Sequence, residues 1–136
     1  MPLGFIATSV CSLSVDPATL LVCVNKSASS HDVILRTKRF SVNLLSASQK
    51  EIANRFTSFR GAERFEPGLW EEGETGCPRL INAAVAFDCD VVAVHDGFSH
   101  SIIVGLVADA SVNLPSAESC LLWHNRTFAH SVLSAA

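Results

Sequence analysis

Two short runs near the start of the chain combine small side chains with hydroxyl groups, and the second run adds a lysine. Residues 8–14 read Thr-Ser-Val-Cys-Ser-Leu-Ser, and residues 25–30 read Asn-Lys-Ser-Ala-Ser-Ser. Small side chains let a flat ring approach the backbone, whose N–H and C=O groups fix its orientation. Hydroxyls and a cation at the start of a helix suit a phosphate group. Together the two runs suggest a site for a flavin nucleotide.

Each run alone also has a simpler explanation. The hydroxyls of residues 8–14 are equally consistent with a strand whose serines face water. Residues 25–30 alone are better explained as the cap of a following helix beside a solvated lysine, because serine and asparagine are common N-cap residues. The functional interpretation therefore requires that the two runs lie side by side.

The strands that would position these runs are predicted from their apolar patterns. An Asp16-Pro17 turn signal separates the first two strands. The nearly continuous apolar residues over 19–25 are typical of a strand covered on both faces. The alternation over 83–94 is typical of a strand with one face in water. We predict about six strands, over residues 4–15, 19–25, 40–44, 83–94, 101–108 and 120–123.

Two helices are predicted between these strands. The first begins near residues 29–30 and ends in the basic residues 36–39, where cations suit the helix dipole. The second opens at Ser46, and Gln49 completes a capping box. Residues 57–80 are predicted to form a long surface loop. Many strands and few helices, without strand–helix alternation, favour an antiparallel β-barrel.

The composition indicates one compact globular domain over residues 1–136. Apolar residues make up 49% of the chain and charged residues 17%, which excludes a disordered chain. A net charge of −3 gives no basic surface for nucleic acid or for an anionic membrane. The low charged fraction is a sign that a second subunit covers part of the apolar surface.

The sequence also lacks the patterns of a membrane protein, a secreted protein and a metal site. No apolar stretch approaches the about 20 residues of a membrane span, and the start of the chain has no secretory signal pattern. The five cysteines lack zinc-ligand spacing, so we predict no metal and interpret them as buried, reduced thiols of a cytoplasmic protein. His31 is expected to be solvated, and Asp88 and Asp90 are expected on the water-facing side of a strand.

Further motifs accompany the two hydroxyl-rich runs in a set order along the chain. They cover residues 4–17, 20–30, 39–46, 49–56, 63–65, 76–80, 86–90 and 100–105. This series resembles the short-chain flavin reductase family, the reductase partners of two-component flavin monooxygenases. The resemblance implies a mainly β fold with few helices: the FMN-binding split β-barrel of Greek-key antiparallel strands.

The chain departs from this family at a few places. The family usually begins with a helix and a strand before the segment that opens this chain, and both elements are expected to be lacking here. Ser99 stands where an aspartate is usual, and Ala129 stands where many relatives have a histidine.

The resemblance implies roles for individual residues. The flavin ring and ribityl chain would be lined by Thr8, Ser9, Val10, Cys11 and Ser14. The ribityl tail and phosphate would be held by Cys23, Val24, Asn25, Lys26, Ser27, Ser29 and Ser30. The far side of the flavin would meet Asn54, Arg55 and Phe56, and the mouth of the site would hold Trp123 and Arg126. The nicotinamide would be positioned by His100.

The resemblance also implies an activity and partners. Hydride would pass from NADH or NADPH to FMN, or to FAD, and the reduced flavin would go to a transient partner oxygenase. The protein would be a homodimer. Two alternatives remain at this point: a non-catalytic flavin-binding module, and a flavin-dependent reductase of another acceptor such as a corrinoid.

Overall fold

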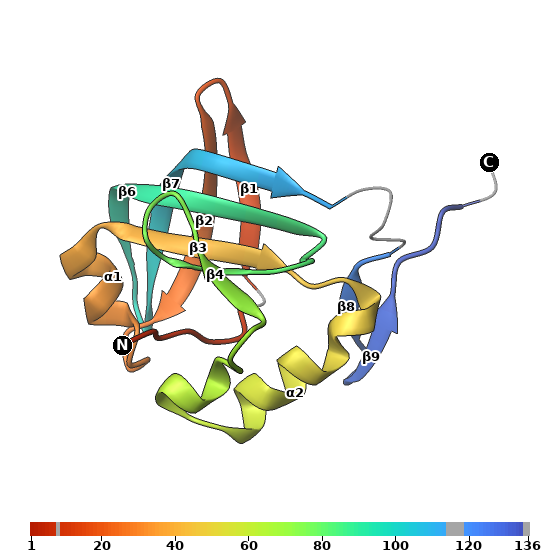
Figure 1. Ribbon diagram of the computed structural model, residues 1–136. Helices are drawn as coiled ribbons and strands as arrows, with labels where there is room; N and C mark the ends of the chain where they lie inside the picture. The colour runs from red at the N-terminus through yellow and green to blue at the C-terminus, as the bar shows by residue number, and fades with distance from the viewer. Residues whose placement is uncertain (8, 114–118, 135–136) are drawn as a thin grey trace.

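Five antiparallel strands form the main sheet, in the order β1–β2–β7–β6–β3. They are β1 (Val10–Val15), β2 (Ala18–Asn25), β3 (Arg39–Leu44), β6 (Val85–Gly97) and β7 (His100–Val112). The computed structural model describes residues 1–7, 9–113 and 119–134 (Figure 1). The prediction of a mainly β, antiparallel fold is confirmed.

Smaller elements surround this sheet. The helices are α1 (His31–Thr37), α2 (Lys50–Ser58) and the short 3-10 helices η1 (Ala47–Gln49) and η2 (Gly61–Arg64). Two separate hairpins pair β4 (Trp70–Glu72) with β5 (Pro78–Leu80), and β8 (Leu121–His124) with β9 (Thr127–His130). The β1–β2 hairpin projects from the sheet, and the β8–β9 hairpin lies beside the start of α2 (Figure 1). No helix of the described ranges is long and apolar enough to cross a membrane.

Three predicted elements differ from the observed ones. The first strand begins at Val10 and not at residue 4. The predicted loop over 57–80 contains η2 and the β4–β5 hairpin, whose strands of three residues are too short to show an alternating pattern. The strand predicted over 120–123 pairs with β9 outside the main sheet.

The core of the sheet is built by alternation along its central strands. Leu20, Val22 and Val24 of β2 are at most 5% exposed, and they share one face with Ile103 of β7. Phe40 and Cys89 complete this buried cluster from the neighbouring strands. Burial of this face fixes the register of β2 against β7, because a slip of one residue would expose the whole apolar set.

A second cluster of aromatic rings attaches α2 to the β4–β5 hairpin. The ring centroid of Phe65 lies 5.2 Å from that of Phe56 and 4.9 Å from that of Trp70. Gly4 lies against Phe56 and Phe65, and Arg64 donates a hydrogen bond to the carbonyl oxygen of Gly4. The start of the chain is thereby held on this cluster.

The expectation that Asp88 faces water is wrong. The loop between β4 and β5 covers this residue, which is 2% exposed, whereas Asp90 is exposed as expected. The amide N–H of Thr75 donates to Asp88 Oδ2 over 3.3 Å. Gly73 lies so close that a Cβ there would be 2.2 Å from the same oxygen. Alternation along β6 correctly separated the two faces, but it does not show which face a distant loop covers.

Candidate functional site

The structure places the start of the first hydroxyl-rich run beside β2, the strand that leads into the second run, whereas Ser14 lies opposite Thr19 at the far end of the hairpin. β1 and β2 pair as an antiparallel hairpin, with Val10 opposite Val22 and Cys11 opposite Leu21. The amide N–H of Cys23 donates to the carbonyl oxygen of Ser9 over 3.0 Å. β1 is the edge strand of the sheet, and its residues from 11 to 15, including Ser14, are exposed. Thr8, the first residue of the predicted site, lies outside the described residues.

The segment from Asn25 to Ser30 forms a tight turn that leads from β2 into α1. The side-chain oxygen of Asn25 accepts hydrogen bonds from the amide and the hydroxyl of Ser27, at 2.9 and 2.8 Å. Ser30 occupies the N-cap position of α1, yet its side chain makes no capping hydrogen bond. Serine capping, the simpler explanation of this segment, is therefore not what the structure shows.

Several donors of this segment are left for a ligand. In the described part of the chain, the amide groups of Ser29 and Ser30 donate to no backbone acceptor. The Ser29 side chain is exposed, whereas Ser30 is buried. Lys26 is exposed and forms an ion pair with Asp96. This donor set, with two amides, hydroxyls and one cation, suits a phosphate.

The turn between β6 and β7 brings His100 to the same place. The amide N–H of Lys26 donates to the carbonyl oxygen of Ser99 over 3.0 Å, and Asn25 lies opposite His100 in the β2–β7 pairing. The hydroxyl of Ser99 lies 2.8 Å from His100 Nδ1. Two parts of the predicted site that are far apart in the sequence are thus neighbours in the structure.

The expectation that His31 is solvated is wrong, since this residue is 6% exposed. Its Nδ1 lies 2.8 Å from Asp32 Oδ1, and its Nε2 lies 2.8 Å from the hydroxyl oxygen of Ser101. A carboxylate can only accept, so Nδ1 donates to Asp32. In the neutral ring Nε2 then accepts from the Ser101 hydroxyl. This contact ties the start of α1 to β7 beside His100.

Replacing His31 with alanine should lower the free energy of unfolding by about 1–2 kcal/mol, because the Ser101 hydroxyl would lose its buried partner. Urea denaturation measures this loss. His95 is exposed, so the matched His95→Ala variant should unfold like the unmodified protein. Equal stability of the two variants would contradict the buried position of His31.

Of the three α2 residues predicted to meet the flavin, Asn54 and Arg55 line a surface hollow, whereas Phe56 lies in the aromatic cluster. A hollow of about 250 Å³ is lined by Glu51, Asn54, Arg55, Ser58, Phe59 and Glu66. The Arg55 guanidinium lies 4.7 Å from the centroid of the Phe59 ring and donates from Nε to the carbonyl oxygen of Glu63. Phe56 is 7% exposed and points into the aromatic cluster, so it supports α2 from behind this hollow.

The residues predicted at the mouth of the site lie on the β8–β9 hairpin. The Trp123 ring packs edge-on against Phe128, with centroids 5.1 Å apart, and remains 59% exposed. Asn125 and Arg126 both adopt positive φ angles, of 50° and 62°, in the turn between the strands. The Lys50 ammonium lies 5.3 Å from the Phe128 centroid, which links the hairpin to the start of α2.

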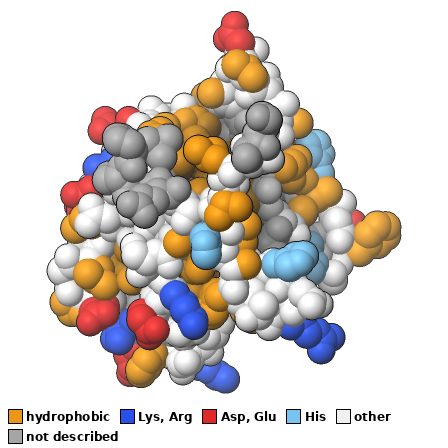
Figure 2. Space-filling view, turned by 90° about the vertical axis from the view of Figure 1, so that its right-hand side faces the viewer, with side chains coloured by type: hydrophobic (Ala, Val, Ile, Leu, Met, Phe, Trp, Pro, Cys, Tyr) orange, Lys and Arg blue, Asp and Glu red, His pale blue; other side chains and the backbone are white. Residues whose placement is uncertain are grey.

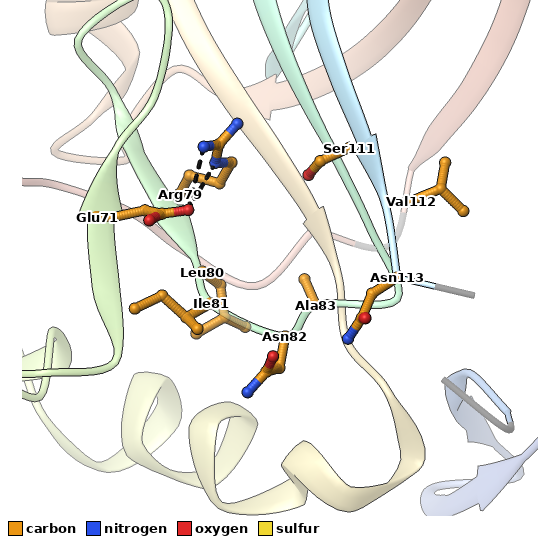
Figure 3. A pocket seen from close by; sticks show the side chains of 9 residues that line it. All are labelled: Glu71, Arg79, Leu80, Ile81, Asn82, Ala83, Ser111, Val112 and Asn113. Carbon is orange, nitrogen blue, oxygen red and sulfur yellow. Dashed lines mark hydrogen bonds and ion pairs between the residues drawn. The ribbon is translucent and has the colours of Figure 1, made fainter. Parts of the chain in front are cut away.

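A second hollow, of about 280 Å³, contains charged residues that sequence reasoning missed. It lies between the β5–β6 connection and the end of β7, and its lining residues are shown in Figure 3. Arg79 is held there at 3.1 Å from Glu71 and at 3.3 Å from Asp109. No sequence pattern joins these three residues, because they come from β4, β5 and β7.

The five thiols lie in different environments, and only Cys89 is fully buried, which corrects the expectation of five buried thiols. Cys11 is exposed on β1. The pKa of the Cys89 thiol is raised to about 12, mainly by burial and to a smaller extent by the negative charges of Asp88 and Asp90. Burial also raises the pKa of Cys77.

We expect a thiol reagent to modify Cys11 rapidly and Cys89 only on unfolding, because the thiolate is the reactive form. The raised pKa keeps Cys89 protonated at every pH well below 12. Timed labelling followed by peptide mass spectrometry measures this order. Cys11→Ser should remove the fast reaction, and rapid labelling of Cys89 in the folded protein would contradict the structure.

Comparison with known proteins gives relatives over nearly the whole chain. Residues 1–131 match the family model described as a flavin reductase like domain. A protein of Agrobacterium fabrum named FMN reductase (NADH) RutF is 39% identical over 126 residues, which cover 92% of this chain and 71% of that protein.

Two solved structures share the fold. Nitrilotriacetate monooxygenase component B from Mycobacterium thermoresistibile is 30% identical, with a TM-score of 0.88 and coverage of 96% of this chain and 72% of that one. The NADH:FAD oxidoreductase SgcE6 of Streptomyces globisporus, in complex with NAD and FAD fragments, is 28% identical. Its TM-score is 0.87, with coverage of 98% of this chain and 80% of that one.

Proposed function

This chain belongs to the flavin reductase like domain family, and from that premise we propose that it is an NADH-dependent flavin reductase that acts on FMN. The observation that carries the proposal is the meeting of three segments at one place. They are the start of the edge strand β1, the turn from Asn25 to Ser30, and the end of the β6–β7 turn at Ser99 with His100 directly after it. The names of the relatives support FMN and NADH as the substrates.

We assign the flavin ring and ribityl chain to Ser9, which directly precedes the edge strand β1, and to Val10, Cys11 and Ser14 of that strand. An edge strand offers unpaired N–H and C=O groups, which suit the polar rim of a flat ring. The phosphate is assigned to Lys26, to Ser29 and to the unpaired amides at the start of α1. These donors fit a phosphate by charge and by number, so the residues present suit the group.

A bound flavin and a bound nicotinamide would themselves supply the chemistry of hydride transfer. The task of the protein is to hold the two rings in register and to exclude competing reactions. In our assignment His100 positions the nicotinamide, and the hydrogen bond between Ser99 and His100 orients the imidazole. Trp123 and Arg126 on the β8–β9 hairpin border the entrance. No buried acid or base is needed for hydride transfer.

A partner oxygenase and a second copy of the chain belong to the same proposal. A relative of this fold is a monooxygenase component, which supports delivery of reduced flavin to an oxygenase. Hydrophobic side chains gather below the projecting β1–β2 hairpin on one face of the molecule (Figure 2). Leu13, Val15 and Val112 are each more than half exposed, so a homodimer that covers them is favoured. We also propose a single functional domain over residues 1–136 and a cytoplasmic location.

The experiment that tests this function is an anaerobic mixture of the protein with FMN and NADH. A flavin reductase bleaches the visible absorbance of oxidised flavin, at a rate proportional to the protein concentration. Flavin binding without bleaching would identify a non-catalytic module instead. Parallel mixtures with FAD and with NADPH measure the cofactor preference. Gel filtration with light scattering measures the oligomeric state.

A further inference from the structure

The cation of the proposed phosphate site already has an anionic partner. The ammonium of Lys26 forms a short ion pair with the carboxylate of Asp96, a residue 70 positions away in the sequence. Their side chains are 43% and 72% exposed, so both can be reached by a ligand. The hydrogen bond from Lys26, together with its charge, holds the pKa of the Asp96 carboxyl below its usual value. Asp96 is therefore ionised at neutral pH.

The fold fixes Asp96 next to Lys26. Asp96 is the penultimate residue of β6 and lies opposite Ser101 in the β6–β7 hairpin. The carbonyl oxygen of Ser99, in the turn of the same hairpin, accepts a hydrogen bond from the amide N–H of Lys26. One hairpin thus contacts the backbone of Lys26 through its turn and the side chain of Lys26 through its strand. The ion pair follows from this arrangement and does not require two freely moving side chains to meet.

We propose that Asp96 limits how tightly the site holds the phosphate of the flavin, because it competes for the Lys26 ammonium. This inference rests on the function proposed above. A bound phosphate dianion needs Lys26, and it is repelled by a carboxylate close by. A reductase that delivers its flavin to another enzyme benefits from such a counter-charge, since the product must leave after each turnover.

The size of the effect follows from the exposure of the pair. Interactions between exposed charges are weak and are screened by salt. Removing the Asp96 charge should therefore tighten FMN binding by about two- to fivefold at low ionic strength, and by less at high salt. Riboflavin has the same ring and ribityl chain but no phosphate, so its affinity should not change.

The test is titration of FMN and riboflavin into the whole chain and its Asp96→Asn variant, followed by flavin fluorescence at low and high salt. The expected result is a lower Kd for FMN alone, together with slower FMN dissociation in stopped-flow measurements. Glu74→Gln removes the same charge from the exposed loop between β4 and β5, and it should leave both affinities unchanged. An unchanged Kd for FMN, or an equal change for riboflavin, would overturn the proposal.

Lys26→Met separates failure of this inference from failure of the proposed phosphate site. If Lys26→Met leaves the preference for FMN over riboflavin intact, the phosphate site itself is wrong. If Lys26→Met removes that preference while Asp96→Asn does not raise it, only the role of Asp96 is wrong. Asp96→Asn should have a smaller effect in the Lys26→Met background, because no ammonium is then left to compete for and only the direct repulsion of the phosphate remains.

Discussion

Replacing Gly105 with alanine should lower the free energy of unfolding by about 3 kcal/mol, because the core has no room for one more methyl group. A Cβ at this position would lie 2.5 Å from Phe40 Cζ and 2.8 Å from Cys89 Cβ. Both neighbours are buried in the main cluster, and Cys89 is attached to a paired strand that cannot shift alone. Urea denaturation measures the loss.

Two further variants separate crowding from other effects of replacing a glycine. Gly68 has a φ of 87°, and a methyl group added there would meet no neighbouring atom within 4 Å, so Gly68→Ala tests backbone strain without crowding. We expect a loss of about 1 kcal/mol there. Phe40→Leu shortens the clashing side chain, and Gly105→Ala should cost less in that background. Equal losses in the Gly105 and Gly68 variants would show that crowding is not the cause.

The parts of the fold that could be predicted are those with a local pattern. β2 and β3 follow from runs of five or more apolar or alternating residues, and the predicted boundaries lie within two residues of the observed ones. β4 and β5 have three residues each, which is too short for a period of two to be recognised.

The candidate site was predictable where its residues are close in the sequence. The Asp16-Pro17 turn joins the strands that carry the two hydroxyl-rich runs, so a hairpin between them could be foreseen. The contacts that Asp96 of β6 and Ser101 of β7 make with this part of the chain could not be foreseen. Asp96 meets Lys26, and Ser101 meets His31, across 70 residues of chain in both cases. Such contacts depend on strand order, which no local pattern specifies.

Replacing Lys26 with methionine should weaken FMN binding by about 10- to 100-fold, which corresponds to the loss of one charge-assisted hydrogen bond to a phosphate. Riboflavin affinity should stay unchanged, because the proposed site assigns the ring and the ribityl chain to other residues. Lys26 is exposed, and its backbone hydrogen bond to Ser99 does not involve the side chain, so the fold should persist. Fluorescence titration of both flavins measures the effect.

The kinetic outcome distinguishes a binding role from a role in hydride transfer. In the proposed site Lys26 contacts the phosphate, far along the ligand from the reacting ring atom, so Lys26→Met should raise the KM for FMN and leave kcat nearly unchanged. Lys38→Met is the matched control, since it removes the same charge at the other end of α1 and should change neither constant. A fall in kcat at saturating FMN would mean that Lys26 also helps to align the rings. No change in either constant would leave this segment as a turn before a helix, with Lys26 paired to Asp96 alone.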